Sequence, residues 1–101
     1  MHWGAVTVII LAVSAPSSHA LAVDDAEALA LVQKHCVMCH ATKPTHESFR
    51  EAPKNIVLET IADIRKHAAT ISAQTVQTKA MPLGNQSGMT DDERATLAQW
   101  L

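Results

Sequence analysis

Hydrophobic residues recur at helical spacing in three segments of the chain, and the stretches between these segments lack a regular period. In the first segment, Leu29, Val32 and Cys36 fall on one face, so the pattern predicts a helix that ends near Cys36. Asp24 or Asp25 can cap its amino end, because a short acidic side chain accepts hydrogen bonds from the unpaired amides of the first turn.

The second helical segment follows a long connection. Residues 37–59 contain prolines, threonines and serines without a sustained period, and a loop of this length is uncommon unless it wraps something. Thr60 and Asp63 can begin a helix, which we predict near residues 61–75. Its apolar face consists of Ile61, Ile64, Ala68 and Ile71.

The third helical segment lies at the end of the chain. A loop from Gln77 to Met89 precedes it, and Thr90 with Glu93 forms a capping-box pattern that predicts a helix from there toward the carboxyl terminus. No segment after Ala20 shows the alternation of a strand, so the sequence predicts an all-α domain with three helices. The apolar stripe of the third helix is Leu97, Trp100 and Leu101.

Residues 1–20 differ physically from the rest, because the 8 basic and 10 acidic residues all lie in residues 21–101. The apolar run at residues 5–15, followed by Pro16 and a short segment up to Ala20, is typical of a secretory signal peptide cleaved after Ala20, ahead of an exported domain at residues 21–101. The run is shorter than the ~20 apolar residues that cross a bilayer. No Lys or Arg precedes it, so a buried core helix and an uncleaved anchor stay open as alternatives.

Length and charge narrow the function classes. A chain of 101 residues is one small domain, which excludes a multidomain enzyme. A formal net charge of -2 supplies no basic field for nucleic acid, so we expect no nucleic-acid partner. Only three aromatic residues occur (Trp3, Phe49 and Trp100), and a small domain rarely gains more than ~3–5 kcal/mol from its core. We therefore expect something else to help fill the interior.

The five residues from Cys36 to His40 read C-V-M-C-H, the pattern of c-type haem attachment. Two thiols three residues apart at the end of a helix can add to the two vinyl groups of one porphyrin, and the adjacent imidazole then reaches the iron from that face. Cys36 and Cys39 are the only cysteines in the chain. The motif therefore predicts one covalent haem c, with His40 as an iron ligand.

A Cys-x-x-Cys pair also occurs in redox dithiols, zinc sites and short disulfides. A redox dithiol belongs with a βαβ pattern, which is absent from this sequence. A structural zinc site needs four ligands, and the fourth would come from His35, His46 or His67 at no recognised spacing. A short disulfide is the remaining alternative. We interpret these three histidines as surface or hydrogen-bonding residues.

Electron transfer requires a second axial ligand, for which methionine is a usual choice. Met81 lies in K-A-M-P-L-G, where a proline and a glycine can present its thioether rigidly. Met89 directly precedes the Thr90 cap and is expected to pack the third helix, because methionine commonly fills a core. Met38 lies between the two cysteines, so its side chain is expected on the wrong face of the haem for a distal ligand. We therefore predict Met81 as the distal ligand, with His67 or His46 as the first replacements if it were displaced.

The mature chain resembles a class I cytochrome c through its C-V-M-C-H, its Met-Pro loop and its T-D-D-E-R helix. It is most similar to the C-terminal cytochrome c domain of the bacterial membrane-bound urate oxidases, over about Ala28 to Leu101. The segments that carry this similarity are C-V-M-C-H-A-T-K-P-T-H-E, A-P-K-N-I-V-L-E-T and K-A-M-P-L-G-N with M-T-D-D-E-R-A-T-L-A-Q-W-L.

The resemblance implies a small three-helix domain wrapped around one haem c, with Cys36 and Cys39 as thioether sites, His40 proximal and Met81 distal. It also implies a periplasmic domain that accepts electrons from a membrane-embedded urate-oxidising domain and passes them to the respiratory chain. We predict an electron carrier rather than an enzyme, with redox protein partners such as a membrane-bound respiratory or urate-oxidising enzyme. Membrane contact is then expected only through a partner or an uncleaved N-terminal segment.

Two other functions stay open. The first is an electron-accepting subunit or detached domain of a membrane-bound urate-oxidising enzyme. A signal-like segment stands where that family has a multi-span membrane domain, so we assign no urate chemistry to this chain. The second, weaker alternative is a thiol-based redox protein.

Overall fold

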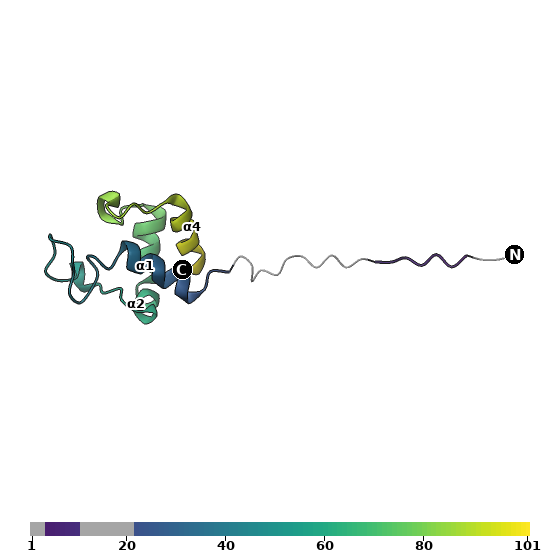
Figure 1. Cartoon of the computed structure of the whole chain (residues 1–101), viewed down its shortest axis with the longest axis horizontal. Helices are drawn as coiled ribbons and strands as arrows, with labels where there is room; N and C mark the ends of the chain where they lie inside the picture. The colour runs from purple at the N-terminus through teal and green to yellow at the C-terminus, as the bar shows by residue number, and fades with distance from the viewer. Residues whose placement is uncertain (1–3, 11–21) are drawn as a thin grey trace.

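The structure is a computed structural model that describes residues 4–10 and 22–101, and this part of the chain contains helices but no strand (Figure 1). The all-α prediction is confirmed to that extent. Residues 4–10 form no helix and their side chains are exposed, so this part of the apolar run is not a buried core helix. The predicted cleavage site at Ala20 lies outside the described residues. None of the described helices has the length and hydropathy needed to cross a membrane.

Helix α1 spans Asp25–His35, close to the predicted bounds. The Asp24 carboxylate caps it by accepting a hydrogen bond of 2.8 Å from the Glu27 amide. Its buried face includes Val32, as the apolar spacing predicted, and Cys36 follows as the carboxyl-terminal cap. The motif residues therefore begin where α1 ends.

The predicted helix at 61–75 is not continuous. It consists of α2 (Ile61–Lys66), α3 (Ala68–Ile71) and the π-helical turn η3 (Ser72–Gln77), which together we call the α2–η3 segment. The break falls at His67, whose ψ of 15° departs from helical geometry. Thr60 and Asp63 form a complete capping box at the start, as predicted.

Helix α4 spans Asp91–Trp100 and begins with the predicted capping box. The Glu93 amide donates to the Thr90 hydroxyl at 3.1 Å, and the Thr90 amide donates to the Glu93 carboxylate at 3.0 Å. The two long loops contain only short 3₁₀ turns, η2 (Pro53–Asn55) and η4 (Leu83–Asn85).

A small apolar core joins these elements. Helix α4 packs against both α1 and η3 (Figure 1). Met89 belongs to this core with 4% of its surface exposed, which confirms its predicted packing role. The buried apolar cluster consists of Val32, Leu58, Ile64, Ile71, Met89 and Leu97.

Candidate functional site

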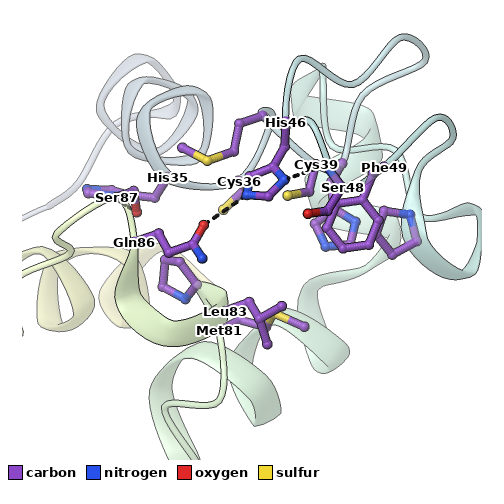
Figure 2. A pocket seen from close by; sticks show the side chains of 14 residues that line it. His35, Cys36, Cys39, His46, Ser48, Phe49, Met81, Leu83, Gln86 and Ser87 are labelled. Atoms are coloured by element: carbon purple, nitrogen blue, oxygen red, sulfur yellow. Dashed lines mark hydrogen bonds between the residues drawn. The ribbon is translucent and has the colours of Figure 1, made fainter.

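Two adjoining cavities, each of about 180 Å³, lie between the end of α1, the α2–η3 segment and the loop at residues 78–90. Cys36, His40 and Met81 border both cavities. Cys39 borders the first cavity, which Figure 2 shows. Residues predicted from two distant parts of the sequence therefore share one site.

A tight turn after α1 carries the cysteines and the histidine to this site. The amides of Cys39 and His40 both donate to the Cys36 carbonyl, at 3.2 and 2.9 Å. This turn sets the C-V-M-C-H motif against the cavities, and both cysteines are free thiols. Met38, which lies between the two cysteines in sequence, also borders the first cavity.

Burial keeps both thiols in the neutral form. It raises the pKa of Cys36 to about 11, with repulsion from Cys39 adding to the effect, and it also raises the pKa of Cys39. A redox dithiol depends on the thiolate, so this environment does not favour that alternative. Among residues 4–10 and 22–101, no group of three His, Cys, Asp or Glu side chains could hold a metal ion.

His40 has a fixed tautomer in this site. Its Nδ1 lies 2.8 Å from the Ile56 carbonyl oxygen, which can only accept, so Nδ1 carries the hydrogen. The other ring nitrogen, Nε2, then has a free lone pair and is able to bind a metal ion. The His40 carbonyl accepts from the Leu58 amide at 2.8 Å, which fixes the backbone as well.

Met81 is held by its backbone on both sides. Its amide donates to the Gln74 carbonyl at 2.9 Å, and its carbonyl accepts from Nη1 of Arg94 at 2.7 Å. The residue borders both cavities, whereas Met89 borders neither and is buried in the core. Met81 and Met89 are the two candidate iron ligands. Of these two residues, Met81 lies beside the cavities that His40 borders, so only Met81 could contact the same bound group as His40.

A hydrogen bond joins two loops at the first cavity. His46 Nε2 lies 2.9 Å from the Gln86 side-chain oxygen (Figure 2). The Ser48 amide donates to His46 Nδ1 at 3.1 Å, so the ring hydrogen is on Nε2 and this nitrogen donates to Gln86. This contact was not predictable from the sequence, because the two residues lie 40 positions apart in irregular segments.

His35 is also part of the first cavity wall, and it is buried rather than a surface residue. Its ring nitrogens lie 2.7 Å from the Ser87 hydroxyl and 2.9 Å from the Glu93 carboxylate. The hydrogen-bonding role expected of this histidine is confirmed. These contacts tie α1, which precedes the thiols, to the start of α4.

Glu93 provides a prediction about acid stability. Hydrogen bonds from His35, the Thr90 amide and Lys34 lower the pKa of its carboxyl from 4.5 to about 2. A lowered folded-state pKa means that this stabilisation is present above pH 4.5 and is lost as the pH falls toward about 2. We expect Glu93→Gln to lose this part of the pH dependence in thermal melts from neutral pH to about pH 2. The control is Glu27→Gln on the exposed face of α1, and an unchanged profile for Glu93→Gln would contradict the prediction.

Comparison with known proteins adds no identification: no family model, no curated protein and no solved structure matches this chain.

Proposed function

We propose that this protein is an exported c-type cytochrome that carries single electrons on one covalent haem c, and that it is not itself an enzyme. The observation that carries this proposal is the convergence of Cys36, His40 and Met81 on the same two cavities, with Cys39 beside them. When bound, haem c supplies the one-electron chemistry of the iron.

The residues present fit this group. The two neutral thiols suit attachment, in which each S–H adds across a vinyl double bond, forming a carbon–sulfur bond and leaving the hydrogen on the neighbouring carbon. This addition needs no oxidant, and the product is a thioether. The largely apolar cavity walls suit the porphyrin ring.

The chain's own residues would tune and hold the iron ligands. Donation from His40 Nδ1 to the Ile56 carbonyl orients the ring and makes Nε2 a better electron donor. Met81 would supply a neutral sulfur, and a His/Met pair raises the reduction potential of the iron relative to a pair of histidines. Because both ligands lie on backbone that is hydrogen-bonded on each side, little rearrangement is expected during electron transfer.

We propose redox proteins of the periplasm as partners, among them a membrane-bound respiratory or urate-oxidising enzyme. Leu83 fits a role in such contacts, because it borders the first cavity and has 57% of its surface exposed. An exposed apolar side chain at the edge of a redox site suits a small and transient interface.

Expression with a cytochrome c maturation system tests the proposal. The protein is expected to bind one haem per chain, and the denatured chain is expected to keep its colour because thioether bonds survive the loss of all other contacts. A haem stain after denaturing electrophoresis and the absorption spectrum of the reduced protein are the measurements. A colourless chain, or haem that passes into acidified organic solvent, would contradict the proposal.

A further inference from the structure

We propose that Arg94 is a positioning residue that fixes Met81 as an iron ligand; this inference rests on the proposed function. Arg94 is 7% exposed, although it belongs to a residue type that usually lies at the surface. One nitrogen, Nη1, lies 2.7 Å from the Thr75 carbonyl and 2.7 Å from the Met81 carbonyl. The guanidinium therefore links the α2–η3 segment to the loop that carries Met81.

No carboxylate in the described part of the chain forms a salt bridge with Arg94. Burial of a cation is unfavourable unless other groups solvate it, and here two backbone carbonyls do so. A salt bridge to a neighbouring acid would stabilise the charge equally well without involving Met81. The particular pair of acceptors indicates that the side chain holds the loop in place.

The π-helical turn η3 explains why these acceptors are available. In an α-helix the Thr78 amide would donate to the Gln74 carbonyl, but here it donates to the Ala73 carbonyl at 3.0 Å. The Gln74 carbonyl is thereby released and accepts from the Met81 amide at 2.9 Å.

The next carbonyl of the turn is used in the same way. In a continuing α-helix the Thr75 carbonyl would accept from the Lys79 amide, but Lys79 has a φ of 57° and the helix has ended. The Thr75 carbonyl accepts from Arg94 instead. Two successive carbonyls of η3 therefore hold Met81, one directly and one through the guanidinium.

This arrangement predicts how tightly the Met81 sulfur would compete with an external ligand. An external base such as imidazole can replace methionine on the iron only if the Met81 side chain withdraws. Loss of the Arg94 hydrogen bonds makes that withdrawal easier, whereas a purely structural role in packing α4 would leave the ligand competition unchanged.

The test compares imidazole binding to the oxidised holoprotein in Arg94→Met, Arg94→Lys and the parent. Hydrogen bonds from a charged donor contribute enough that losing them should strengthen imidazole binding by about tenfold or more in Arg94→Met. Arg94→Lys keeps the charge but not the planar donor geometry, so we expect an intermediate affinity. The matched control is Arg65→Met on α2, an exposed arginine paired with Asp25, which should bind imidazole as the parent does.

Two readouts separate this inference from the proposed function. A parent protein without covalent haem, or without the near-infrared band of a sulfur–iron bond, overturns the proposed function and this inference with it. A parent with both, and with equal imidazole affinity in all variants, overturns the inference alone. If Arg94→Met does not fold, Arg94→Lys decides: tighter imidazole binding with faster exchange of the Met81 amide supports the inference, and parental values of both contradict it.

Discussion

Replacing both Cys36 and Cys39 by serine is expected to abolish covalent haem attachment and to remove most of the cooperative folding of the domain. Each serine keeps the size of the side chain but cannot form a thioether. The cavities beside the motif then lack the group proposed to fill them, and a ligand that binds only the folded state stabilises it. The buried apolar cluster of the described residues has only six members, and a core of a small domain contributes only ~3–5 kcal/mol.

The measurements are a haem stain after denaturation and a thermal melt followed by circular dichroism. The matched control is Val37→Ser, a change within the same turn that leaves both thiols and the His40 ring in place. This control should keep one haem per chain and a cooperative melt. A double variant that remains coloured when denatured, or that melts as cooperatively as the parent, would be inconsistent with attachment through these thiols.

The helix boundaries were predictable where local chemistry sets them. Asp24, Thr60 and Thr90 each accept a hydrogen bond from the backbone of their own helix, and such capping needs only three or four consecutive residues. The burial of Val32 and Leu97 was also predictable, because the 3.6-residue spacing of apolar positions is a local pattern.

The interruption at His67 and the π-helical turn η3 were not predictable from that spacing. Ile64 and Ile71 are buried on either side of the break, so the apolar positions agree with a continuous helix and with a broken one. The π-helical turn also depends on the partners of its carbonyl groups, which lie in the loop of Met81 and in helix α4. They are tertiary contacts that a periodic pattern does not contain.

The candidate site likewise contains residues that the sequence predicted and one residue, Arg94, that it did not. Cys36, Cys39 and His40 are adjacent in sequence, so the motif alone joined them, and the proline and glycine near Met81 marked that loop. Arg94 was missed, although a usable signal was present: it lies three residues before the buried Leu97 and therefore on the apolar face of α4. A basic residue on the buried face of a helix indicates a specific partner inside the protein.

Substitution of Met81 and Met89 by alanine is expected to separate ligation from packing. Met81→Ala should remove the near-infrared band of the oxidised holoprotein and lower its reduction potential, because a sulfur ligand favours reduced iron. Met89→Ala should keep both properties. It should instead reduce the free energy of unfolding by about 2–5 kcal/mol, since it leaves a cavity in the core cluster where only 4% of Met89 is exposed.

The two variants serve as controls for each other, because both remove the same side-chain atoms and both residues lie in the 78–90 loop. The contrast rests on where the thioethers lie: Met81 borders both cavities together with His40, and Met89 borders neither. Chemical denaturation and redox titration of the same two holoproteins give the full comparison. If Met89→Ala lost the band while Met81→Ala kept it and was only destabilised, Met89 would be the ligand. The 78–90 loop would then have to rearrange around bound haem, and the role proposed for Arg94 would be lost as well.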